Sequence, residues 1–169
     1  MGHRRRRFYQ RFEGGVEAHQ GEPLRFMTLP MPGADAAGLR RAFQLLTVRV
    51  RRVYGRFEYL RVVEVGPKGI GVWHLHVAFY GTYIPQVWLS TAWESITGYA
   101  VVHVELADGT AARYMAKSLV GYMAKDGSTG SYGVSSRGWV PQASFRERML
   151  TELGKARVSM NPSRAPRRT

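Results

Sequence analysis

From residue 24 onward, the apolar residues of this chain recur with a period that switches between two and about 3.6 residues in a regular order. Residues 24–29 alternate apolar and polar side chains and end at Pro30, as a strand does. Asp35 then precedes a segment, ending near Tyr54, in which apolar residues recur every three or four positions. That is the pattern of an amphipathic helix with an N-terminal cap. This switching restricts the possible folds more than composition does.

The same alternation of strands and helices continues through the chain. The elements expected next are strands at 57–65 and 72–80, a helix at 85–98, a strand at 99–106, a helix from 108 or 110 to 125, a short strand at 132–135 and a helix at 141–155. The order is that of the ferredoxin-like or RNA-recognition-like split βαβ fold. We therefore predict an α+β protein with a central antiparallel sheet, helices on one face of it and an added C-terminal helix.

Basic residues gather at both ends of the chain. Residues 4–7 are all arginine, and further arginines stand among prolines and serines near the C-terminus. Such segments favour solvated, flexible structure that can lie along phosphates. We predict a basic N-terminal arm at 1–20, a folded domain at 21–140, a C-terminal helix at 141–155 packed on or beside that domain, and a basic tail at 156–169.

Charge and cysteine content restrict the function classes. The chain has 25 Lys and Arg against 12 Asp and Glu, a net charge of +13, which favours a polyanionic partner such as nucleic acid. The absence of cysteine excludes a disulfide scaffold, a thiolate metal site and a cysteine nucleophile. No apolar run is long enough for a membrane span, and no apolar core follows the basic start. We expect a cytoplasmic protein with no membrane partner.

Two histidines on one predicted strand form the sharpest motif. His74 and His76 alternate with Leu75, so they share one face of the strand about 6–7 Å apart at Cα. Glu64 lies on the preceding strand of the predicted hairpin, where its neighbours are apolar. Two imidazoles and a carboxylate suit Mn²⁺ or Mg²⁺ with positions left open for phosphate oxygens. The alternative is a pair of solvent-facing histidines and a carboxylate that pairs with an arginine.

A second motif carries paired tyrosines and lysines. The tetrapeptide Tyr-Met-Ala-Lys occurs twice, starting at Tyr114 and at Tyr122. On a helix, Lys117 and Lys125 each lie one turn from their tyrosine, where an ammonium favours phenolate or neutralises a phosphate under attack. Eight residues of helix rotate by about 80° and rise by about 12 Å, so both tyrosines cannot reach one metal together. The alternative is a stripe of side chains that packs in the core.

Arranged in this order, the motifs resemble the HUH endonucleases of rolling-circle replication, the Rep initiators of plasmids and single-stranded DNA viruses. The resemblance covers roughly residues 24–139. Residues 26–30 resemble the first family motif, the His-Leu-His stretch at 74–76 resembles the metal-binding motif, and Glu64 stands where many members supply a third ligand. The two Tyr-Met-Ala-Lys stretches are similar to the Tyr-x-x-Lys motif. Residues 133–139 are similar to a Val-Ser-Arg-Gly-Trp stretch of some phage and archaeal members.

The resemblance implies a metal-dependent enzyme that nicks and joins single-stranded DNA and so initiates rolling-circle replication. Tyr114 or Tyr122 would be the nucleophile and would form a 5′-phosphotyrosyl intermediate, and Lys117 or Lys125 would offset charge on the phosphate. Two-tyrosine members usually space their nucleophiles four residues apart, whereas eight separate them here. Tyr114 is slightly favoured because it lies early on the expected helix. The implied partners are single-stranded or hairpin origin DNA, and a host helicase and polymerase.

Three other functions are compatible with these motifs. A transposase of the same chemistry would differ only in its DNA substrate. A metal-dependent hydrolase would use water and form no covalent adduct. A non-catalytic single-stranded nucleic-acid-binding module would need exposed aromatic side chains on the central strands, for which Phe26, Tyr59 and Phe79 are the candidates.

Overall fold

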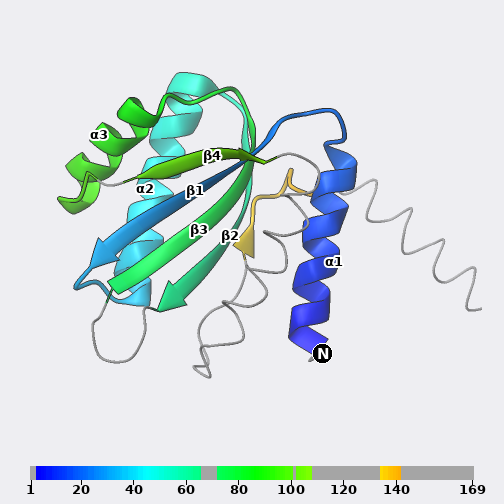
Figure 1. Cartoon of the computed structure of the whole chain (residues 1–169), viewed down its shortest axis with the longest axis horizontal. Helices are drawn as coiled ribbons and strands as arrows, with labels where there is room; N and C mark the ends of the chain where they lie inside the picture. Colours follow the sequence, from blue (N-terminus) through cyan, green and yellow to red (C-terminus); the bar gives the residue numbers. More distant parts are fainter. Residues whose placement is uncertain (1–2, 66–71, 101, 108–133, 142–169) are drawn as a thin grey trace, which may run out of the picture.

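The computed structural model describes residues 3–65, 72–100, 102–107 and 134–141 (Figure 1). Its elements in chain order are α1 (His3–Ala18), β1 (Leu24–Pro32), α2 (Ala36–Tyr54), β2 (Phe57–Val65), β3 (Val72–Gly81), α3 (Gln86–Thr97), β4 (His103–Ala107) and β5 (Val134–Ser135). The strands form one five-stranded antiparallel sheet in the order β4-β1-β3-β2-β5. The predicted α+β class with a central antiparallel sheet is confirmed.

Local sequence accounts for most element boundaries. The carboxylate of Asp35 accepts a hydrogen bond from the Gly38 backbone N–H at 2.6 Å, which caps α2 as predicted. Helix α3 ends where Gly98 adopts a left-handed conformation with φ of 82°. The strand expected at 99–106 is observed as β4, which begins later, at His103. The helices expected at 108–125 and 141–155 lie outside the described residues, apart from Pro141 itself.

One face of the sheet packs against α2 and α3. Leu75, Val77 and Phe79 are the β3 side chains that point to this face, and all three are fully buried. Their main partners from the two helices and from β1 are Leu39, Phe43, Leu46, Leu89, Trp93, Met27 and Leu29. The indole N–H of Trp93 donates to the Pro30 carbonyl at 3.0 Å, which ties α3 to β1. This is the core that the split βαβ pattern predicts.

The opposite face, called here the α1 face, is covered by a helix that was predicted to be a flexible arm. Figure 1 shows α1 on the far side of the strands from α2 and α3. Phe8 and Phe12 of α1 are buried with Trp139 against Ala78 and Tyr80 of β3. Burial of each such aromatic side chain contributes about 1.5–3 kcal/mol, enough to order a short helix. The predictions of a flexible arm at 1–20 and of helices on one face only are therefore wrong.

Helix α1 packs on the sheet because its apolar residues have a helical spacing. The run of arginines at its start makes that spacing hard to see in the sequence. Phe8, Phe12 and Val16 follow one another at intervals of four residues, so they form one apolar stripe along α1. Gly15 lets Trp139 approach this stripe, because a Cβ at that position would lie 2.1 Å from the indole Nε1. That indole N–H donates to the Arg11 carbonyl at 3.0 Å.

No helix in the described part of the chain is long and apolar enough to cross a membrane.

Candidate functional site

The pairing of β2 with β3 brings together the three residues predicted as metal ligands. Glu64 lies directly opposite His74 in the register of the two strands. His76, two residues further along β3, is on the same face, and the centroids of the two imidazole rings are 6.3 Å apart. This is the α1 face, onto which Ala78 and Tyr80 also point. The predicted juxtaposition of Glu64 with the histidine pair is confirmed.

His76 is held from both sides by hydrogen bonds. Its Nε2 lies 2.8 Å from the Glu64 Oε2, and its Nδ1 lies 3.2 Å from the hydroxyl Oγ1 of Thr28 on β1. Thr28 and His76 are register partners in the β1–β3 pairing, so the backbone fixes this contact. A neutral imidazole can donate through Nε2 to the carboxylate and accept through Nδ1 from the hydroxyl. The ring is therefore oriented with Nε2 toward Glu64.

Burial affects the protonation of His76. The side chains of His76 and Glu64 are only 15% and 18% exposed. Burial lowers the pKa of His76 below its usual value, and the hydrogen bond and charge of Glu64 partly oppose that effect. The neutral imidazole that burial favours is the form that coordinates metals.

The donor atoms of Glu64, His74 and His76 are of types that suit a divalent ion, although the His76 and Glu64 side chains hydrogen-bond to each other in this conformation. Among the described residues, no group of three or more His, Asp or Glu side chains is arranged to hold a metal ion. An octahedral ion with bonds of about 2.1 Å requires adjacent donor atoms about 3 Å apart. The 2.8 Å separation between the His76 and Glu64 donor atoms is close to that value. Because a hydroxyl can either donate or accept, Thr28 can also hold the tautomer whose Nε2 is free for a metal.

A further histidine and carboxylate lie on the α1 face but apart from this set. His103 of β4 is the register partner of Thr28, and its Nε2 lies 3.8 Å from the Glu105 Oε2. The His103 side chain is 69% exposed. Strand β1 lies between β4 and β3 in the sheet, so a whole strand separates His103 from His76. His103 is therefore a matched control for the histidines of the site.

The predicted tyrosine and lysine residues are not part of the described structure. Tyr114, Lys117, Tyr122 and Lys125 lie outside the described residues. Their positions relative to the site on β2 and β3 stay predictions.

Arginines on α2 supply positive charge close to the sheet. The helix contains five arginines and no acidic residue. All five are exposed: Arg40, Arg41, Arg49, Arg51 and Arg52. Arg51 and Arg52 lie in the last turn, where they also complement the helix dipole. A helix whose charged side chains are all exposed arginines is the electrostatic pattern of a protein that contacts phosphates.

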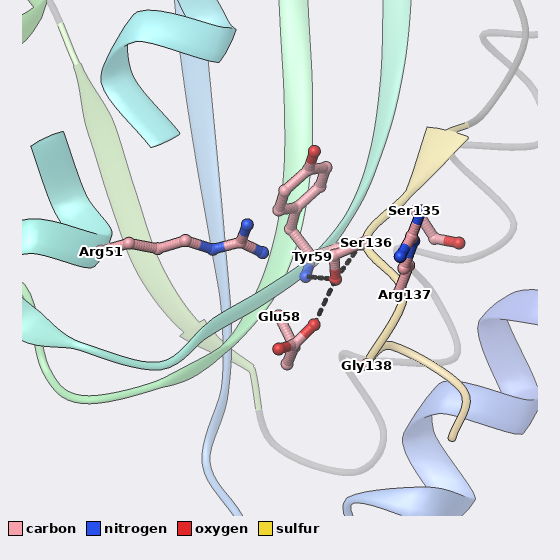
Figure 2. A pocket seen from close by; sticks show the side chains of 7 residues that line it. All are labelled: Arg51, Glu58, Tyr59, Ser135, Ser136, Arg137 and Gly138. Atoms are coloured by element: carbon pink, nitrogen blue, oxygen red, sulfur yellow. Dashed lines mark hydrogen bonds between the residues drawn. The ribbon is translucent and has the colours of Figure 1, made fainter. Parts of the chain in front are cut away.

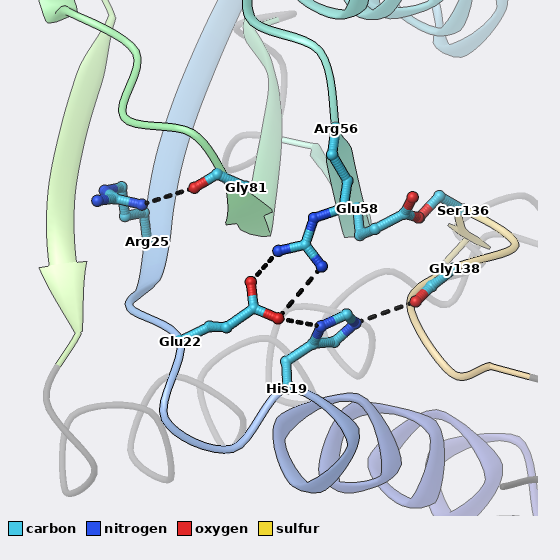
Figure 3. A network of polar contacts seen from close by, with 8 residues as sticks. All are labelled: His19, Glu22, Arg25, Arg56, Glu58, Gly81, Ser136 and Gly138. Atoms are coloured by element: carbon cyan, nitrogen blue, oxygen red, sulfur yellow. Dashed lines mark hydrogen bonds and ion pairs between the residues drawn. The ribbon is translucent and has the colours of Figure 1, made fainter.

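A second polar network, which sequence reasoning missed, holds the segment at 134–141 against the end of α1 (Figure 3). His19 lies 3.0 Å from the Glu22 carboxylate through Nδ1 and 3.0 Å from the Gly138 carbonyl through Nε2. Arg56 pairs with the same carboxylate and is the main reason why the pKa of Glu22 is lowered. The network links residues 119 positions apart, so no local pattern reveals it.

The fold and these contacts define a basic α+β protein with a polar His-Glu cluster on one face of an antiparallel sheet. The family model of the replication-associated protein ORF2/G2P matches residues 24–127, more than half of the chain. The matched range contains Thr28, Glu64, His74 and His76. The chain therefore belongs to the replication-associated protein ORF2/G2P family. No curated protein and no solved structure was found to match it.

Proposed function

We propose that this replication-associated protein is an HUH endonuclease of the plasmid or viral Rep type. It nicks and joins single-stranded DNA and so initiates rolling-circle replication. Family membership supports a role in replication. The observation that carries the nicking chemistry is the position of Glu64, His74 and His76 on one face of the β2–β3 hairpin, with His76 hydrogen-bonded to Glu64.

Glu64, His74 and His76 would hold a divalent ion, Mn²⁺ or Mg²⁺. When bound, such an ion acts as a Lewis acid that polarises the oxygens of the scissile phosphate. The chain itself contributes orientation. Thr28 holds the Nδ1 of His76, so the ring presents its Nε2 on the Glu64 side. Contacts of this kind raise the basicity and fix the position of a coordinating histidine.

Tyr114 or Tyr122 would supply the nucleophile. The tyrosine Oη forms a bond to phosphorus, the bond from phosphorus to the 3′ oxygen breaks, and that oxygen leaves as a 3′-OH after taking a proton. The 5′ end stays linked to the protein as a phosphotyrosine. Because no water is consumed, a later 3′-OH can reverse the step and join the strand. Lys117 or Lys125 would offset the negative charge that develops on the phosphate.

The proposed substrate is single-stranded or hairpin origin DNA. The five arginines of α2 offer phosphate contacts beside the sheet, and the net charge of +13 favours association with a polyanion. In the cell, we place this activity in the cytoplasm together with a host helicase and polymerase. A transposase would use the same chemistry on a different DNA end, so the choice of DNA substrate separates these two roles.

The buried aromatics count against the alternative of a non-catalytic binding module. Phe26 and Phe79 are 3% and 0% exposed. The ring of Tyr59 packs edge-on against Phe43, with centroids 4.9 Å apart. Phe26 and Phe79 are thus unavailable for the base stacking that a single-strand-binding sheet requires, and Tyr59 is the one of the three that is only half-buried.

The test is a denaturing gel of the protein after incubation with Mn²⁺ and single-stranded origin candidates that carry the label at the 3′ end, the end that stays linked to the protein. We expect a labelled protein band that is lost in His74→Ala and in one of Tyr114→Phe and Tyr122→Phe. His103→Ala, the matched control, keeps the band. Cleavage without a labelled band would instead identify water as the nucleophile. Tight binding with no cleavage in any metal would contradict the proposal and favour a binding module.

A further inference from the structure

An open groove lies at the edge of the sheet where β5 ends beside β2. Its volume is about 590 Å³. The groove is lined by Arg51, Glu58, Tyr59, Ser135, Ser136, Arg137 and Gly138 (Figure 2). Ligand sites commonly have volumes of about 300–1,000 Å³, so this one has room for a phosphate and its sugar.

The wall formed by residues 135–138 is firmly attached to β2. The Ser136 N–H donates to the Tyr59 carbonyl at 2.8 Å, and the Tyr59 N–H donates to the Ser136 hydroxyl at 2.9 Å. That hydroxyl donates in turn to the Glu58 carboxylate at 2.5 Å. Gly138 lies against the same carboxylate, because a Cβ there would be 2.4 Å from the Glu58 Cδ. The buried indole of Trp139 anchors the segment from the other side.

Two guanidinium groups from different elements reach this groove. Arg51, from the last turn of α2, donates one N–H to the Phe57 carbonyl at 3.0 Å, which leaves four of its five donors. Arg137 is exposed and has no hydrogen-bond or ion-pair partner in the described part of the chain. Glu58 is the single carboxylate among the lining residues. Two cations against one anion, with the hydroxyl of Ser135 nearby, suit a phosphate, which guanidinium groups bind in a bidentate manner.

The groove lies on the same strand as the proposed metal site. Glu58 and Glu64 are six residues apart on β2, which corresponds to about 20 Å of extended chain. A single DNA strand that enters the metal site and continues along β2 therefore passes this edge. We propose that the groove binds a backbone phosphate of that strand, several nucleotides from the scissile bond. The inference rests on the proposed function for the identity of the strand.

The experiment compares the affinity of fluorescein-labelled oligothymidylates of two lengths, about 3 and about 16 nucleotides, by anisotropy without metal. We expect Arg137→Ala to weaken binding of the longer oligonucleotide about tenfold, the usual effect of losing a charged hydrogen bond. The shorter one, which cannot cover both sites, changes less than about twofold. The salt dependence of the longer one falls by about one unit of slope. Because Arg137 has no hydrogen-bond or ion-pair partner among the described residues, the variant should fold normally, and circular dichroism checks this.

Glu58→Gln tests whether the loss of a negative charge from the groove strengthens DNA binding, as the loss of a positive charge should weaken it. Glutamine keeps an acceptor for Ser136 but removes a negative charge from the groove, so it should strengthen binding of the longer oligonucleotide by about threefold. Glu94→Gln removes an exposed carboxylate from α3 and is the matched control. A role of Glu58 in folding alone would not strengthen binding. Equal changes in the two glutamine variants would overturn the assignment.

Two further outcomes would overturn the proposal. The first is an Arg137→Ala effect that is absent, or equal for the two lengths. The second concerns inorganic phosphate, whose binding is measured by isothermal titration calorimetry. If the longer oligonucleotide does not displace the bound phosphate, the groove is a site for a free anion. The adduct assay separates this inference from the proposed function. A covalent adduct in the wild type, together with unchanged DNA binding by Arg137→Ala, would support the endonuclease proposal and contradict the groove proposal. No adduct, together with weakened DNA binding by Arg137→Ala, would support the groove proposal and contradict the endonuclease proposal.

Discussion

Two glutamates near the ends of β2 point to the same face of the sheet and meet different environments. Glu64 receives a hydrogen bond from His76, which Thr28 holds on its other side. Glu58 receives one from Ser136 and lies against Gly138 beside two arginines. The sequence of β2 alone does not distinguish the two residues, because both are glutamates and their even spacing on an alternating strand puts both side chains on one face. Their neighbours across the sheet, rather than their own segment, decide that one belongs to a proposed metal site and the other to a groove.

The two ends of the α1 face differ in the same way. At the Glu58 end, Tyr80 and Trp139 are buried and pack together with ring centroids 5.3 Å apart. At the Glu64 end, polar side chains take the place of aromatic ones. One end therefore contributes apolar burial to stability, whereas the other holds the polar groups of the proposed metal site. Variants at the two ends should separate into losses of stability and losses of activity.

The largest expected effect is on activity at the Glu64 end. Glu64→Gln should lower metal-dependent nicking by about 10³-fold, because Lewis-acid assistance contributes several kcal/mol. Its thermal unfolding midpoint should stay near that of the wild type. Glu58→Gln, the same change at the other end of the strand, should leave the nicking rate on saturating DNA within about twofold. Single-turnover gel assays measure both rates, and equal losses in the two variants would remove the distinction between the glutamates.

At the packed end, the largest effect should be on stability. Trp139→Ala removes a fully buried indole and should lower the free energy of unfolding by about 3–5 kcal/mol. Gly15→Ala should lower it by about 1–3 kcal/mol, because the new Cβ would lie 2.1 Å from that indole.

The double variant sharpens this prediction. Without the indole, alanine at position 15 of the helix should stabilise by about 0.5–1 kcal/mol, so its effect changes sign. Urea titrations of the four proteins give the coupling. Additive effects would mean that Gly15 and Trp139 are not in contact.

The packed end should also produce a dependence of stability on alkaline pH. Burial raises the pKa of Tyr80 to about 12, and the charge of Glu22 adds to the shift. A phenol in the unfolded chain has a pKa of about 10. The stabilisation is therefore complete below pH 10 and is lost as the pH rises toward 12, about 2–3 kcal/mol in all. Tyr80→Phe should remove this loss in denaturant titrations at successive pH values, whereas Tyr83→Phe, at a 61% exposed position, should not.

A smaller effect on activity than the loss of Glu64 is expected at Thr28, which holds His76. Thr28→Val keeps the shape of the side chain but removes the hydroxyl that holds His76, so Mn²⁺ affinity should fall by about 10- to 100-fold. Thr28→Ser, which restores a hydroxyl, should bind nearly as well as the wild type. Calorimetric titration with Mn²⁺ measures both. An unchanged affinity in Thr28→Val would show that the hydroxyl does not orient the ligand.

Local patterns were sufficient to predict the hairpin and the face shared by Glu64, His74 and His76. Strand alternation fixes which side chains share a face, and the Gly-Pro-Lys-Gly sequence between the two predicted strands favours their pairing as a hairpin. The helix at α1 was missed because four arginines dominate its start, although Phe8 and Phe12 carry the helical spacing. The groove was missed for a different reason. Glu58 and Ser136 are 78 residues apart, and the pairing of β5 with β2 that makes them neighbours follows from no local pattern.

The most direct test of the account is the binding of Mn²⁺ itself, measured by calorimetry on the whole chain without DNA. The account predicts that the wild type and His103→Ala bind one ion with similar affinity, and that His74→Ala and Glu64→Gln lose at least about tenfold in affinity. Equal binding by all four proteins, or no binding by the wild type, would contradict the assignment of Glu64, His74 and His76 as the metal site.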